Sequence, residues 1–309
     1  MIIRSDPKVK NQIFDQEQGD DYEDTTDYSD QFPDDDIKYS ISTPQSFLEK
    51  LQSASLFTTM REAHKYTIQS STITQTQKEI TVQTRLAVVD WIFRVVDRVR
   101  YSRETFFNSI AVLDHVLSKI SLTKQNIQLY AATCLWISAK LYETKNRELN
   151  IFTAVCQNQY QQDDFTKTEM DIITCLEGCI EYPTPQIFIQ ALLIDTDLKD
   201  CEKLCNFFLD ISLSVGDFDE IPAHLVAAAA IVVSATSIDK YCPMIKLLTI
   251  IHYTDQASLL KVARSLVDVA HSIVEKNVGG IFAFYAKDSH DYLANAVKKA
   301  TEYLQNAVH

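Results

Sequence analysis

The sequence predicts an all-α protein made of two tandem five-helix units, with one further helix before them and one after them. Two apolar stretches carry this prediction: Leu129–Glu143 (LYAATCLWISAKLYE), in which Lys140 is the one charge among the first thirteen residues, and Leu225–Ala235 (LVAAAAIVVSA), which has none. A helix that is apolar all round is normally buried on every side, so each stretch is expected to lie at the centre of its own unit. Because the stretches are about a hundred residues apart, they indicate two copies of one helical unit. Five glycines and seven prolines in 309 residues leave little turn chemistry for β-hairpins.

Length and composition favour a globular protein without a membrane span. The 309 residues fit about two domains, and 46% of them are hydrophobic, which is enough for substantial cores. No apolar run approaches the roughly twenty residues of a membrane span, and the start, MIIRSDPKVK, has too short an apolar part for a signal peptide. We therefore expect a protein of the cytoplasm, the nucleus or both, with its seven cysteines as free thiols.

The charge of the chain is uneven. The formal net charge is −13, and residues 1–40 hold twelve acidic and four basic residues. Such a segment cannot bury enough apolar surface to offset the entropy lost on ordering, so we predict an acidic disordered tail over residues 1–40. It is either a solubilising extension, the favoured interpretation, or an interaction tail. The rest of the chain is mildly acidic and has no basic surface of the size that nucleic-acid binding needs.

Two pairs of cysteines, Cys175/Cys179 and Cys201/Cys205, are each four residues apart and would share a helix face. A zinc site is one interpretation, but no histidine stands at ligand spacing beside either pair. Small buried core residues are the favoured interpretation. We therefore predict no metal site, and no other pattern in the sequence suggests a cofactor.

The elements before and within the first unit follow from capping residues and apolar periodicity. In residues 41–78 a helix begins at Thr43-Pro44, a good N-cap followed by a proline suited to the first turn, and Ser70–Lys78 is a polar connector. The first unit spans residues 79–181. Its predicted helices are Glu79–Arg98, Glu104–Ser118, the central stretch Leu129–Glu143, a shorter helix around Leu149–Gln157, and one near Phe165–Glu177.

The first predicted helix of this unit has two apolar faces, so one face can meet the central helix and the other something else. Thr84, Ala87, Val88, Trp91 and Val95 lie on one face, and Leu86, Val89, Phe93 and Val96 on the other. A narrow polar stripe of Asp90, Arg94 and Asp97 separates them, with an expected ion pair between Asp90 and Arg94 one turn apart.

The second unit spans residues 182–280 and repeats the arrangement, with its apolar helix again third of five. Tyr182-Pro183-Thr184-Pro185 is a stiff linker whose second proline suits a helix start. The predicted helices lie near 185–194, 200–214, 223–239, 243–251 and 256–275. Residues 281–309 follow as a C-terminal segment with a final amphipathic helix over Asp288–Gln305.

Several short motifs occur at a spacing that matches one known family. TRLAVVDW (Thr84–Trp91) resembles the opening of the cyclin box, MR-A-I-L-V-D-W, VLDHVLS (Val112–Ser118) resembles Y-I-D-R-F-L-S, and Leu135–Glu143 resembles L-A-S-K-F-E-E. In the second half, Leu204–Leu213, Ile221-Pro222 with its alanine run, Phe284-Tyr285 and Tyr292–Ala294 are similar to further family motifs. The likeness covers about residues 43–300 in the order of A- and B-type cyclins, so the two units resemble two tandem cyclin folds.

The resemblance implies a regulatory subunit that has no catalytic residues. The family's partner is a cyclin-dependent protein kinase, which the cyclin activates by positioning the αC helix and the activation loop, in control of the cell cycle and mitosis. The alternative is a cyclin-fold transcription or adaptor protein that activates no kinase, but the basic DNA-facing surface and cysteine-rich ribbon of the transcription-factor class are missing. An enzyme is a weaker third interpretation, because no phosphate loop, metal set or nucleophile–base pair stands out.

The resemblance also implies which residues bind the kinase. Lys140 and Glu169 match the family's lysine and glutamate that hydrogen-bond near αC, since Glu169 stands fourteen residues before Pro183 as the family's glutamate does before its A-P-T segment. Apolar contact positions match Leu141, Ile173 and Ile180. For Lys140 the alternative is an ordinary lysine whose stem packs while its ammonium stays in water. For Glu169 it is a capping box, Thr166-x-x-Glu169, that only closes a helix start.

Two further sets of residues follow from the resemblance. Arg85 and Asp114 match a buried ion pair inside the first fold. The family's docking groove for R-x-L substrate and inhibitor peptides maps to Thr84, Ala87, Val88, Trp91 and Arg94 in a degenerate form. Arg94 replaces the glutamate that meets the peptide's basic residue, and it would repel that residue. The groove is therefore vestigial or tuned to another peptide, or these residues simply pack against the N-terminal helix.

Overall fold

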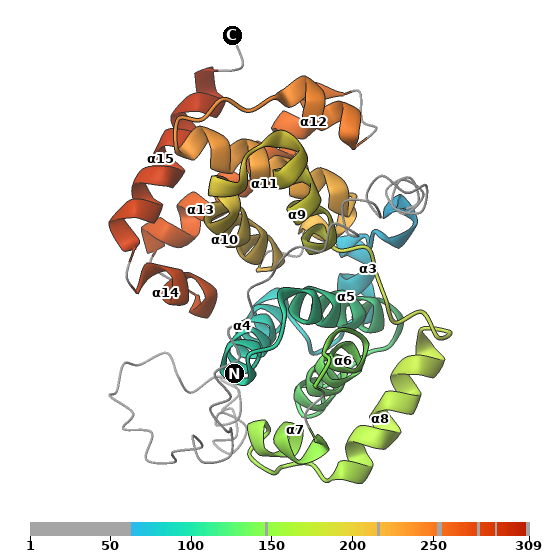
Figure 1. Cartoon of the computed structure of the whole chain (residues 1–309). Helices are drawn as coiled ribbons and strands as arrows, with labels where there is room; N and C mark the ends of the chain where they lie inside the picture. The colour runs from blue at the N-terminus through green and yellow to red at the C-terminus, as the bar shows by residue number, and fades with distance from the viewer. Residues whose placement is uncertain are drawn as a thin grey trace, which may run out of the picture.

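The computed structural model describes residues 63–145, 148–214, 217–251, 255–276, 279–287 and 289–306, and within them it contains helices and no strand (Figure 1). The prediction of an all-α protein with two tandem units is confirmed. The predicted acidic tail and the helix at Thr43-Pro44 lie outside the described residues. Among the described helices, none is long and apolar enough to cross a membrane.

The first unit forms the lower half of the molecule in Figure 1 and is built around α6 (Ile127–Tyr142). α5 (Arg103–Lys119) and α8 (Gln162–Cys175) pack most extensively on α6, and α4 (Val82–Val99) and α7 (Leu149–Val155) complete its surroundings. Most of α6 is buried, as the apolar sequence predicts, but its last turn reaches the surface. This emergence places Lys140 and Leu141 at an edge of the unit.

The second unit lies above the first and is built around α11 (Ala223–Ser237). Every residue of α11 from His224 to Ser237 is buried, because the alanine run lets neighbouring helices approach closely. Its neighbours are α9 (Pro185–Thr196), α10 (Glu202–Leu213), α12 (Met244–Ile250), α13 (Gln256–Lys276) and α15 (His290–Asn306).

Helix boundaries follow local capping chemistry at several places. Thr81 and Ser102 cap the starts of α4 and α5, because their side chains accept hydrogen bonds from the backbone N–H groups of Thr84 and Thr105, respectively. α4 ends at Val99, and its C-cap Arg100 adopts the left-handed conformation with φ of 58°. These caps turn the chain sharply between α4 and α5, so that the two helices can pack together on the first unit's core.

The prediction of a connector over Ser70–Lys78 is wrong, because Ser70–Thr76 forms helix α3. α3 packs on the end of α5. At its C-terminal end the Gln77 amide donates to the carbonyls of Leu117 (2.6 Å) and Ile120 (2.7 Å) and accepts from the backbone N–H of Leu122 (3.0 Å). The sequence of this segment is polar and has no apolar stripe, so it gives no local sign of a helix. The contacts that hold α3 come from residues about forty positions later in the chain.

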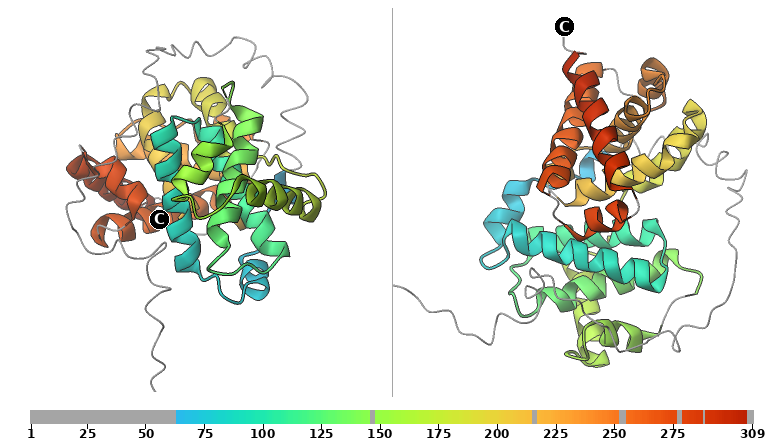
Figure 2. Two further views of the ribbon diagram at one scale, coloured as in Figure 1. Left: turned by 90° about the horizontal axis from the view of Figure 1, so that it is seen from below. Right: turned by 90° about the vertical axis from the view of Figure 1, so that its left-hand side faces the viewer.

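A second unpredicted helix, α14 (Gly280–Ala286), links the two units at the left of Figure 1. It packs on α4, and both carboxylate oxygens of Asp90 accept hydrogen bonds from its first backbone N–H groups, Gly280 (2.9 Å) and Ile281 (3.2 Å). The expected Asp90–Arg94 pair is therefore wrong, because Asp90 serves the start of α14 instead. The right-hand view of Figure 2 shows α14 between α4 and the rest of the second unit.

The cysteines are unpaired thiols in environments that differ between the two predicted pairs. Cys201 and Cys205 are buried, as predicted, but Cys179 lies beyond the end of α8 and is exposed, so the shared helix face with Cys175 is wrong. Burial raises the pKa of Cys156 and of Cys242 to about 12, which keeps both protonated. In the described part of the chain no cluster of three or more metal-binding side chains is present.

His115 on α5 makes the stability of the fold depend on pH. Its ring stacks on Tyr182 at 3.7 Å, and Nδ1 lies 2.7 Å from the carbonyl oxygen of Ala111. Burial lowers the pKa of His115 below its usual 6.5, although that carbonyl and the nearby Asp114 carboxylate act in the opposite direction. Below pH about 6.5 the His115 ring binds a proton more readily in the unfolded chain than in the folded chain. The neutral, buried His115 ring therefore supports the folded state above pH about 6.5, and this support is lost as the pH falls below that value.

We expect the free energy of unfolding of the wild type to decrease from pH 7.5 to pH 5.5 more steeply than that of His115→Phe, and urea denaturation at both pH values measures the difference. His271→Phe, at an exposed histidine of α13, is the matched control and should keep the wild-type pH dependence. Equal pH dependence in His115→Phe and the wild type would contradict the assignment.

Candidate functional site

The exposed last turn of α6 meets the middle of α8 and brings the two predicted polar residues together. The Lys140 ammonium donates to the Glu169 carboxylate, and its Nζ lies 3.8 Å from the ring centroid of Trp136. The Lys140 side chain is about a third exposed and that of Glu169 about a sixth. The pair is thus at the surface, where a partner protein can reach it, and not in the core.

The alternative interpretation of Glu169 as part of a capping box is wrong. α8 begins at Gln162, and the capping box that is present pairs Gln161 with Asp164. The Thr166 hydroxyl donates to the carbonyl oxygen of Gln162 inside the helix. Glu169 therefore lies in the middle of α8, not at its start, and its carboxylate has no part in closing a helix end.

The three predicted apolar contact residues differ in exposure. Leu141 is 43% exposed, while Ile173 and Ile180 are partly buried, with Ile180 packed against the core. We call the set Lys140, Leu141, Glu169, Ile173 and Ile180 the α6–α8 face. This face thus combines a charged pair at the surface with one exposed and two partly buried apolar side chains.

Sequence reasoning missed two residues beside this face. Met170 is 59% exposed and lies next to Ile173 by helical spacing on α8, a position that the α8 pattern alone could have shown. Glu143, directly after α6, accepts hydrogen bonds from the backbone N–H (2.7 Å) and hydroxyl (2.9 Å) of Ser102 at the start of α5. This cap fixes the end of α6, and therefore Lys140 and Leu141, relative to α5.

Tyr142 occupies the position where the family motif has a glutamate. Its hydroxyl donates to the Glu181 carboxylate at 3.2 Å. Burial, and to a smaller extent that carboxylate, raises the pKa of Tyr142 above its usual value. A neutral hydrogen-bond donor thus stands at this edge of the α6–α8 face in place of a negative charge.

Arg85 and Asp114 pair inside the first unit, as the resemblance implies. The Arg85 guanidinium donates Nε–H to Asp114 Oδ1 at 2.7 Å and Nη2–H to Asp114 Oδ2 at 2.5 Å, and both side chains are buried. A third donor, Nη1–H, reaches the carbonyl oxygen of Leu213 at 2.8 Å. Because Leu213 ends α10, this buried pair also joins the first unit to the second.

The residues predicted for the docking groove do not form one open surface. Thr84 and Val88 are buried, Ala87 and Trp91 are partly buried, and Arg94 is exposed. A methyl group added at Gly280 would lie 3.0 Å from Arg94 Nη1, so the start of α14 lies directly beside the Arg94 guanidinium. The second unit therefore borders this part of α4, which sequence reasoning did not indicate.

Comparison with known proteins identifies the two units. Residues 55–181 match the family model for the cyclin N-terminal domain, and residues 183–299 match the model for the cyclin C-terminal domain. The chain belongs to the cyclin family. The first unit is thus a cyclin N-terminal domain and the second a cyclin C-terminal domain.

Curated relatives include both A- and B-type cyclins. Cyclin-B2-1 of Arabidopsis thaliana is 22% identical over 75% of this chain and 54% of its own length. Cyclin-A1-2 of Oryza sativa subsp. japonica is 26% identical over 63% of this chain and 42% of its own, and the G2/mitotic-specific cyclin-B3 of Mus musculus is 24% identical over 74% and 16%. This cyclin chain thus spans about half the length of its plant relatives or less.

Solved structures share the fold at low sequence identity. A viral cyclin from herpesvirus saimiri has a TM-score of 0.62 and 16% identity, covering 69% of this chain and 96% of its own. A chain of the yeast RNA polymerase II CTD kinase complex has a TM-score of 0.54 and 15% identity, covering 75% of this chain and 81% of its own. Both likenesses concern the cyclin fold alone.

Proposed function

We propose that this cyclin is the regulatory subunit of a cyclin-dependent protein kinase, acts in the cytoplasm or nucleus, and works in cell-cycle control. The α6–α8 face carries the proposal, since it presents an ion pair beside the exposed Leu141 at the positions where the family motifs predict kinase contacts. The A- and B-type relatives and the solved chain from a kinase complex support it. The chain itself contributes no catalytic group in this proposal.

The mechanism is binding that favours one conformation of the kinase. A regulatory subunit can activate a kinase only if it binds the active arrangement of αC and the activation loop more tightly than the inactive one. On the α6–α8 face, Leu141 and Ile173 offer apolar area to a kinase helix, while Lys140 and Glu169 supply a donor and an acceptor at a fixed place. Inward positioning of αC would then complete the kinase's own Lys–Glu pair.

The test of this proposal is purification of the tagged chain from its own cells, identification of any co-purifying kinase, and reconstitution of that kinase with the pure chain. We expect a cyclin-dependent kinase whose activity rises with added cyclin and saturates at one to one. A chain that recovers transcription or adaptor proteins and activates no co-purifying kinase would contradict the proposal.

We expect basic R-x-L peptides to bind the wild type weakly. Arg94 is exposed where a basic residue of the peptide would lie, and the buried Thr84 and Val88 offer little floor. Arg94→Glu should strengthen binding by a few-fold up to about tenfold, because an exposed charge pair contributes about 1 kcal/mol at most. Fluorescence titration of a labelled peptide measures the change, with Arg94→Gln separating loss of repulsion from gain of attraction. Tight binding by the wild type that Arg94→Glu weakens would overturn the prediction.

A further inference from the structure

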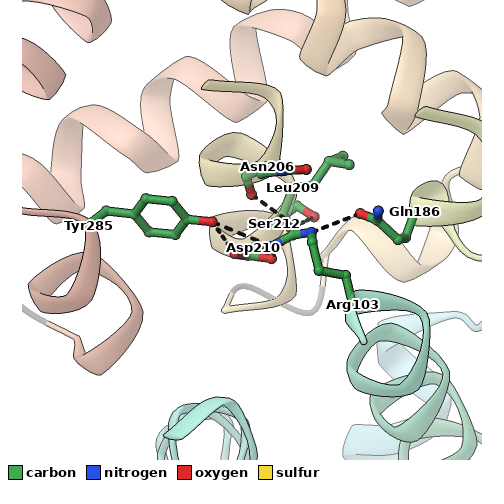
Figure 3. A network of polar contacts seen from close by, with 7 residues as sticks. All are labelled: Arg103, Gln186, Asn206, Leu209, Asp210, Ser212 and Tyr285. Atoms are coloured by element: carbon green, nitrogen blue, oxygen red, sulfur yellow. Dashed lines mark hydrogen bonds and ion pairs between the residues drawn. The ribbon is translucent and has the colours of Figure 1, made fainter. Parts of the chain in front are cut away.

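A buried polar network joins the two cyclin domains at Arg103, the first residue of α5 (Figure 3). Its guanidinium donates to both carboxylate oxygens of Asp210 on α10, with Nη2 2.7 Å from Oδ1 and Nη1 2.9 Å from Oδ2. It also donates to the Gln186 side chain on α9 at 3.1 Å and to the carbonyl oxygen of Asn206 at 3.3 Å. The Tyr285 hydroxyl on α14 donates to Asp210 Oδ2 at 2.6 Å. That hydroxyl also accepts a longer hydrogen bond from Arg103 Nη1 at 3.4 Å, so one side chain of the N-terminal domain engages three helices of the C-terminal domain.

The charges in this network depend on each other. The Asp210 side chain is fully buried, and that of Arg103 is 27% exposed. Burial opposes the charge on Arg103, but the Asp210 carboxylate outweighs it and raises the pKa of Arg103, so the guanidinium stays charged. Because a bidentate pair of this kind fixes direction as well as distance, it restrains how the two domains are oriented.

Two other polar links cross the same boundary, and both start from α4. Arg85 donates to the carbonyl oxygen of Leu213, and Asp90 accepts from the first backbone N–H groups of α14. Arg85 and Asp90 are five residues apart on one helix, so their side chains leave α4 about 140° apart and contact the C-terminal domain on two sides of that helix. The Arg103 network adds a bidentate charged link from a second helix, α5.

We propose that Arg103 is a positioning residue that fixes the orientation of the C-terminal domain relative to the N-terminal domain. By this role it sets the orientation in which the C-terminal domain is presented to a bound kinase. The part concerning the kinase rests on the proposed function. All residues of the α6–α8 face belong to the N-terminal domain, so loss of Arg103 should alter the orientation of the C-terminal domain while leaving the kinase-binding surface intact.

The test measures the distance between the domains by pulsed electron paramagnetic resonance, with spin labels on the exposed thiol of Cys179 and on Ile245→Cys. Ile245 is 80% exposed on α12, which Figure 1 shows at the end of the C-terminal domain far from α4. We expect one narrow distribution in the Ile245→Cys chain with an intact network, which serves as the wild-type reference, and a broadened or shifted one when Arg103→Gln or Asp210→Asn is added. Arg103→Lys, which retains the charge but not the fork, should broaden it less and serves if Arg103→Gln does not fold.

The matched control is Arg100→Gln, which removes an exposed arginine directly after α4 that, among the described residues, pairs with Asp97 on the surface. It should leave the distribution unchanged. If all folded Arg103 and Asp210 variants keep the wild-type distribution, the network adds only stability and the proposal is overturned.

Measurements with the kinase form the second arm. Arg103→Lys should keep kinase affinity within about twofold, because the hydrogen bonds of Arg103 involve no residue of the α6–α8 face, while activity at saturating cyclin falls. Unchanged activity together with a broadened distribution would overturn the statement about presentation to the kinase. A wild type that binds no kinase would contradict the proposed function, but it would leave the distance measurement as a valid test of the orientation.

Discussion

Lys140→Ala and Glu169→Ala are each expected to weaken kinase binding by about 2–5 kcal/mol, which is on the order of thirtyfold or more in Kd. In the free protein the two side chains satisfy one another at the surface of the first domain. A kinase that covers the α6–α8 face removes water from both, so truncation of either one leaves a desolvated charge without its partner. Activity should recover at high cyclin concentration, since only affinity is lost.

The fold should survive these substitutions. An ion pair that is partly exposed contributes about 1 kcal/mol or less to stability, and Glu169 closes no helix end. Circular dichroism melts and calorimetric titration with the kinase measure the two effects separately. Lys167→Ala is the control, because Lys167 is exposed and points away from the α6–α8 face on the same helix. Wild-type affinity in both single variants would refute the assignment of these residues.

Asp114→Ala is expected to lower the free energy of unfolding by about 3–5 kcal/mol, because it leaves the buried Arg85 guanidinium without a counter-charge. The loss is a large fraction of the total stability of an ordinary domain, which is about 5–15 kcal/mol. Arg85→Ala should be at least as damaging, since it also removes the hydrogen bond to the carbonyl oxygen of Leu213 in the second domain. Urea denaturation followed by circular dichroism measures both.

A double replacement separates the charge from the packing. Arg85→Met with Asp114→Leu should recover part of the stability that either single change removes, because an apolar pair of similar volume leaves no unpaired buried charge. Arg100→Ala is the surface control, at an exposed pair with Asp97, and should change stability by less than about 1 kcal/mol. A loss below about 1 kcal/mol for Asp114→Ala would show that the buried pair has little structural weight.

The candidate site was reached from sequence through the resemblance to cyclins and not through spacing. Lys140 and Glu169 are 29 residues apart, and nothing local in either helix indicates that they meet. From the sequence, Glu169 could close the start of a helix or lie within one. Because α8 begins at Gln162, Glu169 lies within the helix. Met170 was missed because an exposed methionine beside the predicted contacts has no motif of its own.

The sequence by itself determined the helical class, the two units and their central helices. These properties depend on apolar periodicity and on the absence of charge, which act within one or two turns of a helix. α6 and α11 are apolar over their own length, so their burial could be predicted without knowledge of their neighbours.

Only the tertiary structure decided which polar groups join distant parts of the chain. α3 is held by Gln77 against the end of α5, Asp90 serves the start of α14, and Arg103 meets Asp210 107 residues later. Each of these side chains lies on a helix or directly after one, in a local pattern that is compatible with exposure to water. Their partners are fixed by the packing of helices from both domains, and a hydrogen bond between distant residues leaves no periodic trace in the sequence.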